Sequence, residues 1–136
     1  MTDGGPERDA IDAELTARLV AEQFPQFGTL PVAPVARSGW DNRTFRLGDD
    51  HLVRLPSTGN YIDQVAKEQR WLPELGQHLP LPIPTPEGLG TPTSYFPRPW
   101  SIYRRIPGND LIEAPVEPAS LASDLGLFLT ALYAAP

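Results

Sequence analysis

The sequence predicts an α+β fold, with helices and β-strands following one another along a single modest domain. Three observations support this class. Apolar residues recur at helical spacing over 9–24, 60–72 and 118–134. Two segments of alternating apolar and polar residues flank a Gly/Asp-rich joint at 48–50, which is typical of a β-hairpin. The length of 136 residues suffices for one domain with its own core. The expected order is helix, three strands, helix, strands, helix.

The N-terminal part begins with a helix and continues into an irregular strand. In 9–24, Ile11, Leu15 and Leu19 recur every fourth residue, and Pro25 ends the run. The following "TLPVAPVARSG" contains prolines that lack the N–H needed for a complete ladder, so it suits only the edge of a sheet.

The predicted hairpin consists of "RTFRL" and "HLVRLP", joined by Gly48, Asp49 and Asp50. The spacing of apolar residues then becomes helical over 60–72. Asn60 and Asp63 are the expected N-terminal cap pair of that helix. Pro73 is expected to close or kink it.

The second half of the chain is rich in proline. "LPLPIPTPEGLG" has proline at every second position and is therefore extended. We favour an edge strand plus linker here over a ligand for a proline-recognising domain. "PWSIYRRIPG" is the next strand candidate, ended by Pro107 and Gly108.

The last predicted helix has Pro118 in its first turn. It carries a continuous apolar stripe, which consists of Leu121, Leu125, Phe128 and Leu132, widened by Leu129. Such a stripe needs a partner, because a contiguous exposed apolar patch drives association. Packing against a further helix, folding back onto the sheet, and dimerisation all remain open.

Composition excludes several classes of function. The net charge of −6 argues against a nucleic-acid partner, which requires clustered positive charge. The absence of cysteine excludes disulfides, thiolate catalysis and Cys-ligated zinc. His51 and His78 do not form a pair at metal-ligand spacing. Trp40, Trp71 and Trp100 are expected to be packing residues rather than stacking platforms.

No targeting or membrane segment is expected. The N-terminal "MTDGGPERDA" is polar and acidic and lacks the basic and apolar regions of a signal peptide. No apolar run reaches the length of a membrane span. A cytoplasmic protein without membrane contact is therefore the expectation.

An arginine inside an apolar strand requires a partner, because burying a lone charge costs several kcal/mol. Alternation along "HLVRLP" places Arg54 on the same face of the strand as Leu52 and Pro56. Glu68 falls on the apolar stripe of the helix over 60–72. These positions predict an Arg54–Glu68 ion pair that ties strand to helix. The alternative is a solvated Arg54 paired across the hairpin with Asp49 or Asp50. The order of glycine-containing hairpin, strand cation and helix glutamate occurs in nucleotide-dependent phosphotransferases.

Four segments together resemble one known family. "SGWDNRTFRLGDDHLVRLP", "KEQRWLPELGQHLPLPIPTPEGLG" and "PWSIYRRIPG" are similar to the N-terminal lobe of the aminoglycoside phosphotransferases, whose fold is similar to that of protein kinases. "LASDLGLFLTALY" resembles the first helix of that family's C-terminal lobe. The similarity runs over about 35–136. It implies a kinase-like nucleotide-binding N-lobe over 1–107, with an N-terminal helical segment over 1–28. Residues 108–136 are then a linker and the first helix of a truncated C-lobe.

The resemblance implies a site for ATP or GTP. The residues implied are Ser38, Gly39, Arg54, Glu68, Tyr103, Arg104 and Ile106. Ser38 and Gly39 belong to a loop over the nucleotide phosphates. Arg54 takes the position of the strand cation on the α- and β-phosphates, where many members have lysine, and Glu68 orients it.

The base is expected at "YRRIPG", which follows the second strand candidate. Tyr103 is implied at the back of the adenine pocket. Backbone groups of Arg104 and Ile106 are implied to hydrogen-bond the base. Backbone contacts leave the choice between adenine and guanine open.

The family's catalytic segment is missing from this sequence. The His-x-Asp…Asn segment and the later metal-binding Asp have no counterpart, since His51 and His78 lead into "HLVRLP" and "HLPLPI". No catalytic residue or metal ligand is therefore assigned within the chain. Mg²⁺ ligands and the pocket for a small hydroxylated acceptor are expected in the missing C-lobe, so the chain alone is expected to be inactive.

Two other functions remain possible. In the first, the chain is a standalone non-catalytic module. It either binds nucleotide weakly or binds another protein through the helix over 118–134. Self-association through that helix belongs to this possibility. Alternatively, it is a small structural α+β domain on which nucleotide has no effect.

Overall fold

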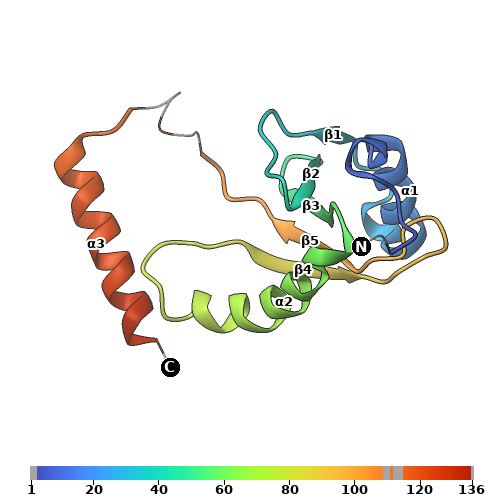
Figure 1. Ribbon diagram of the computed structural model, residues 1–136. Coiled ribbons are helices and arrows are strands. Elements are labelled where there is room, and N and C mark those ends of the chain that lie inside the picture. Colours follow the sequence, from blue (N-terminus) through green and yellow to red (C-terminus); the bar gives the residue numbers. More distant parts are fainter. Residues whose placement is uncertain (1–2, 109–110, 112–114, 136) are drawn as a thin grey trace.

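A five-stranded antiparallel sheet forms the centre of the molecule, with the strand order β1-β2-β3-β5-β4. The computed structural model describes residues 3–108, 111 and 115–135. Helices α1 and α2 cover opposite faces of the sheet, and α3 stands apart (Figure 1). The α+β prediction is confirmed.

The strands are β1 Val32–Pro34, β2 Asn42–Leu47, β3 His51–Pro56, β4 Thr85–Gly90 and β5 Trp100–Arg104. The helices are α1 Ala13–Gln23, α2 Ile62–Gly76 and α3 Pro118–Ala134, with short 3₁₀ turns η1 Arg8–Ala10, η2 Pro25–Phe27 and η3 Gly59–Tyr61.

The predicted hairpin is formed by β2 and β3. Asn42 pairs with Pro56 at its open end, and Leu47 pairs with His51 at its turn. Gly48 adopts φ +62°, a left-handed conformation that other residues rarely take. The proline-containing β1 lies at the edge beside β2, as its sequence predicted.

Strand β5 lies between β3 and β4, so the proline-rich β4 becomes the opposite edge. The edge position predicted for this segment is confirmed. Gly90 of β4 pairs with Trp100, and a Cβ at Gly90 would meet the indole at 1.9 Å. Only glycine lets the indole lie across the strand at this position.

The main core lies between the sheet and the N-terminal segment. Alternate sheet residues from β2, β3 and β5 face Leu19 and Val20 of α1. The sheet side consists of Phe45, Leu47, Val53, Leu55, Trp100 and Ile102, all fully buried. Trp100 packs edge-on against Phe24, with ring centroids 5.4 Å apart.

Of the three tryptophans, which were expected to be core or packing residues rather than stacking platforms, Trp100 alone belongs to the core. Trp40 is 81% exposed and Trp71 is 43% exposed, whereas Trp100 is fully buried. Trp40 lies in the loop before β2, and Trp71 lies within α2. Tryptophan content alone therefore gave no information on position in the fold.

The helix expected over 9–24 is divided in the structure. A 3₁₀ turn, η1, comes first, and α1 begins after Asp12. The Asp12 carboxylate accepts a hydrogen bond from Leu15 N at 2.9 Å, which makes Asp12 the N-cap. Capping by this aspartate starts the α-helix later than the apolar spacing indicated.

The cap pair expected for α2 is wrong. Thr58 starts the preceding 3₁₀ turn by accepting a hydrogen bond from Asn60 N at 3.2 Å, and the chain passes from η3 directly into α2. Tyr61 occupies the N-cap position without a side-chain cap. Pro73 lies inside α2, which continues to Gly76. Proline removes one backbone hydrogen bond here without ending the helix.

Helix α3 begins as predicted, with Pro118 in its first turn. Glu117 caps it by accepting hydrogen bonds from Ala119 N at 3.0 Å and Ser120 N at 2.8 Å. None of its residues is buried, so the apolar stripe does not fold back onto the sheet. Within the described part of the chain, no helix is long and apolar enough to cross a membrane.

Candidate functional site

The predicted ion pair joins strand β3 to helix α2. Arg54 Nη1 lies 3.3 Å from Glu68 Oε1 and 3.2 Å from Glu68 Oε2. The two side chains are 31% and 19% exposed, so the pair is partly shielded but still reachable from solvent. The alternative partner for Arg54 across the hairpin is wrong, because Asp49 instead lies 4.0 Å from Arg46. The cation is therefore fixed in orientation and remains partly open to a ligand.

Tyr103 holds the same glutamate from the neighbouring strand. It lies on β5 opposite Leu52, is almost fully buried, and its hydroxyl donates a hydrogen bond to Glu68 Oε2. Burial, followed by the contact with Glu68, raises the pKa of Tyr103 to about 12. The phenol therefore stays protonated and donates at physiological pH. The Arg54 guanidinium lies 5.4 Å from the centroid of the Tyr103 ring.

A second contact fixes α2 on the sheet one residue beyond Glu68. Gln69 Nε2 donates to Ser101 Oγ at 3.0 Å and to the Gly88 carbonyl at 3.1 Å. Ser101 is the register partner of Arg54. The position of Glu68 relative to Arg54 is thus set by both β4 and β5. Neither Gln69 nor the Tyr103–Glu68 contact was predicted from the sequence.

The loop over 35–41 lies beside the Arg54 end of this arrangement. Ser38 Oγ donates to the Asn42 carbonyl at 3.0 Å and accepts from Thr44 N at 3.2 Å. Thr44 is the β2 register partner of Arg54, so Ser38 anchors the loop directly next to the strand cation. Gly39 is exposed, and a Cβ there would meet nothing within 4 Å.

The segment after β5 lines a pocket with the entry to β4. The residues around it are Pro82, Ile83, Thr85, Arg104, Arg105, Ile106 and Pro107. Proline and isoleucine side chains make up much of its wall. Arg105 N donates to the Asp50 carbonyl at 2.7 Å, which ties this segment to the hairpin turn.

The structure thus brings the predicted site residues into three groups. Arg54, Glu68 and Tyr103 form one connected cluster, and the loop with Ser38 and Gly39 adjoins it through Thr44. Arg104 and Ile106 line the pocket, and Arg104 directly follows Tyr103 in β5. Contact with a nucleotide stays a prediction for all of them.

Comparison with solved structures gives the fold of the chain. The GDP complex of a mutant aminoglycoside 2'-phosphotransferase-IIIa aligns with a TM-score of 0.81 at 24% identity, covering 92% of this chain and 42% of that one. The wild-type GDP complex aligns with a TM-score of 0.80 at 24% identity, covering 91% and 42%. The streptomycin–ATP complex of APH(2")-IIa aligns with a TM-score of 0.55 at 20% identity, covering 90% and 40%.

This chain therefore has the fold of part of these proteins and spans less than half of their length. A search of curated protein sequences finds no significant match. The sequence model of the phosphotransferase enzyme family matches residues 32–136, which is most of the chain and includes every predicted site residue. This match over most of the chain shows that the chain belongs to the phosphotransferase enzyme family.

Proposed function

We propose that this chain is the nucleotide-binding lobe of an ATP- or GTP-dependent O-phosphotransferase that acts on small, aminoglycoside-like molecules. Arg54 contacts the α- and β-phosphates in this role, and Glu68 orients its guanidinium. Arginine neutralises phosphate with bidentate geometry, whereas lysine supplies a point charge. Mg²⁺, whose ligands we place outside this chain, would when bound supply further positive charge against the phosphates.

The observation that carries the proposal is the partly exposed Arg54–Glu68 ion pair. A carboxylate and a buried tyrosine orient the guanidinium, yet 31% of the Arg54 side chain is exposed to solvent. An anion is the ligand that such an oriented cation attracts.

The positions of loop, cation and pocket suit the shape of a nucleotide. Arg54 pairs with Ser101, and Arg104 lies three residues further along β5. That separation is about 10 Å at the usual rise of a strand, comparable with the reach from a base to its β-phosphate. The Ser38–Gly39 loop then lies over the phosphates, and the pocket beside Arg104 and Ile106 receives the base.

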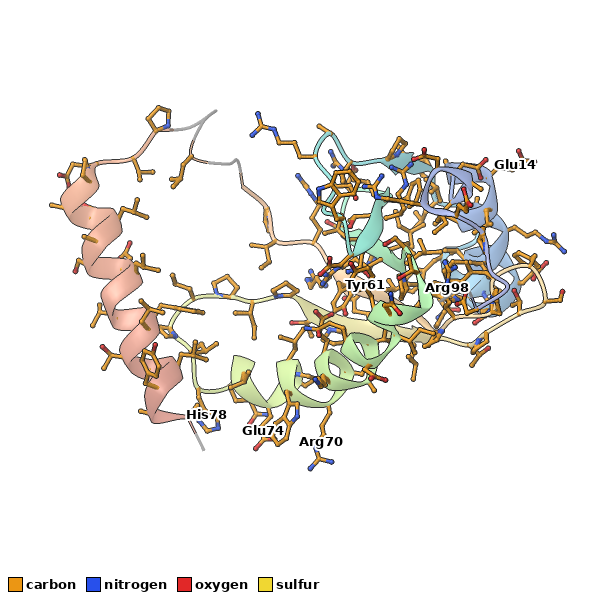
Figure 2. The ribbon with its side chains drawn as sticks, viewed as in Figure 1. Glu14, Tyr61, Arg70, Glu74, His78 and Arg98 are labelled. Atoms are coloured by element: carbon orange, nitrogen blue, oxygen red, sulfur yellow. The ribbon has the colours of Figure 1, made fainter. Side chains whose placement is uncertain are left out.

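Titration of the chain with MgGDP and MgADP tests this proposal. We expect binding by the wild-type chain and a loss of affinity of about tenfold or more in Arg54→Ala, since a charge-assisted hydrogen bond contributes about 1.5–3 kcal/mol. Arg70→Ala is the matched control. Arg70 lies on α2 two residues after Glu68, but its side chain points away from the sheet and its guanidinium stacks on Trp71 (Figure 2). Absence of nucleotide binding, or equal affinity in Arg54→Ala, would contradict the proposal.

We infer further that phosphotransfer requires a second lobe. The division lies near residue 107, with 1–107 as the nucleotide lobe and 108–136 as the linker and first helix of the other. Two observations support it: the exposed apolar α3 and the chain's coverage of 42% of the aligned aminoglycoside phosphotransferase. In this proposal the catalytic residues, the Mg²⁺ ligands and the acceptor pocket belong to that second lobe. The proposed location of the protein is the cytoplasm. Assay of the chain with MgGTP or MgATP and kanamycin is expected to give no phosphorylated product; turnover would contradict this division.

A second candidate function is a non-catalytic module that associates through α3. The exposed leucines of α3 are available for association, and in this candidate the partner of the stripe is a second copy of the chain. Sedimentation velocity over a range of concentrations is expected to show a dimer that Leu125→Glu converts to a monomer. A wild-type chain that stays monomeric at every concentration would rule this candidate out.

A further inference from the structure

The N-terminal residues 3–8, which we call the strap, reach the loop over 35–41 at Arg8. The strap precedes the region that the family model matches, which begins at residue 32. Its last residue, Arg8, donates from Nη2 to the Gly39 carbonyl at 2.9 Å. The same guanidinium lies 5.4 Å from the Trp40 ring centroid. One arginine thus contacts consecutive residues of the loop that we assign to the nucleotide phosphates.

Buried Arg98 anchors the strap at its other end. Arg98 Nε and Nη2 donate to the two Asp3 carboxylate oxygens at 2.6 and 2.9 Å, and Nη2 also donates to the Pro6 carbonyl at 2.9 Å. The Arg98 side chain is only 3% exposed. Figure 2 shows Arg98 beside the N-terminal segment. A buried guanidinium with a carboxylate and backbone acceptors holds the strap in a defined place.

Arg98 also connects the strap to the end of β3, which supports the loop from a second direction. Arg98 Nη1 donates to the Pro56 carbonyl at 3.1 Å. The next residue, Ser57, donates from Oγ to the Trp40 carbonyl at 2.6 Å and from its backbone N to the Asp41 carbonyl at 2.9 Å. Gly39, Trp40 and Asp41 are therefore held by groups that share Arg98 as their anchor.

Without these contacts the exposed loop would have to be ordered when nucleotide binds, and that ordering costs affinity. Contacts already made in the free protein reduce this cost. We propose that Arg8 is a positioning residue for nucleotide binding, which acts by holding the phosphate loop over 35–41 in its binding conformation. This inference rests on the proposed function for the identity of the ligand. The ordering of the loop itself does not depend on any ligand.

The test compares Arg8→Ala with Arg18→Ala in the full chain. Arg18 also has one aromatic and one hydrogen-bond contact, away from the loop: its guanidinium lies 3.8 Å from the Tyr95 ring centroid, and its Nε lies 3.0 Å from Glu22 Oε1. Hydrogen–deuterium exchange of the peptide over 35–41 is measured without nucleotide, and MgGDP affinity is measured in parallel. Arg8→Lys keeps the positive charge but loses the planar fork, and serves as a milder variant if Arg8→Ala proves unstable.

We expect faster exchange over 35–41 and weaker MgGDP binding in Arg8→Ala, with a change in affinity of about three- to tenfold for one lost hydrogen bond. Arg18→Ala should match the wild type in both measurements, and Arg8→Lys should lie between. Unchanged exchange in both Arg8 variants would overturn the inference, as would faster exchange with unchanged affinity. If the wild-type chain binds no MgGDP, the proposed function fails, and the exchange comparison alone then decides whether the strap orders the loop.

Discussion

The sheet with its two covering helices and the C-terminal helix α3 use similar apolar residues in opposite ways. Phe45 and Trp100 of the sheet are fully buried against the N-terminal segment. In α3, Leu125 is 51% exposed and Tyr133 is 87% exposed, and no residue of the helix is buried. The sheet finds its apolar partners within the chain, whereas α3 presents an apolar surface without one among the described residues.

This difference separates folding from association. Burial of apolar surface stabilises the sheet region at about 25 cal/mol per Å² removed from water. The same residue types contribute little in α3 until a partner covers them. The candidate nucleotide cluster lies in the stably packed sheet region, since Arg54, Glu68 and Tyr103 all belong to the sheet and the helix packed on it. We therefore expect substitutions in the sheet region and α3 to have very different effects.

The largest effect is expected for Trp100→Ala in the sheet. Removing this fully buried indole leaves a cavity beside Gly90 and Phe24 and should lower the free energy of unfolding by about 3–5 kcal/mol. Urea unfolding followed by far-UV circular dichroism measures the change. A loss below 1 kcal/mol would contradict the packing described for β4 and β5.

Asp3→Ala is expected to have the next largest effect, about 3 kcal/mol, because it leaves the buried Arg98 guanidinium without a counter-charge. The hydrogen bond from Arg98 lowers the pKa of Asp3 to about 2 from its usual 3.8. A lowered pKa in the folded state means that the contribution of Asp3 is complete above pH 4 and is lost as the pH falls towards 2. Wild type and variant should therefore differ at pH 7 and converge near pH 2. A constant difference over that range would exclude the ion pair as the cause.

Tyr103→Phe is expected to have a smaller effect on stability, about 1 kcal/mol for one hydrogen bond. It removes the donor to Glu68 while keeping the buried ring, so nucleotide affinity should also fall severalfold. Because the pKa of Tyr103 is raised to about 12, its contribution is complete below pH 10 and is lost only as the pH rises through about 12. The difference between variant and wild type should thus be the same at pH 6 and pH 9. A difference that varies between these two values would indicate another origin.

The smallest effect is expected for Leu125→Ala in α3. An exposed position without a packed partner usually changes stability by less than about 0.5 kcal/mol. The same urea titration serves as the measurement. A loss comparable with that of Trp100→Ala would mean that α3 is buried in solution.

Local patterns predicted the parts of the fold that local chemistry determines. The hairpin over 42–56 follows from alternation and from a glycine that tolerates a positive φ. The Arg54–Glu68 pair could be predicted, beside the alternative of Asp49 or Asp50 as the partner, because each charge interrupts an apolar surface and the other can compensate it. The edge positions of β1 and β4 follow from their prolines.

Contacts between segments that lie far apart in the sequence could not be predicted from local sequence patterns. Asp3 and Arg98 are 95 residues apart in the sequence, and nothing in either segment indicates the other. The insertion of β5 between β3 and β4 likewise depends on long-range pairing. Family resemblance implies a position for Tyr103 behind the base. Its contact with Glu68 instead follows from strand alternation, which puts Tyr103 on the same face of β5 as Ser101, towards α2.

The central claim is that Arg54 recognises nucleotide phosphates, and comparing a nucleotide with its nucleoside tests it most directly. NMR titrations of the wild type and Arg54→Ala with MgGDP and with guanosine give four affinities under the same conditions. We predict that Arg54→Ala weakens MgGDP binding by about tenfold or more and leaves guanosine binding unchanged. Equal losses for both ligands, or none for MgGDP, would contradict the assignment of Arg54 to the phosphates.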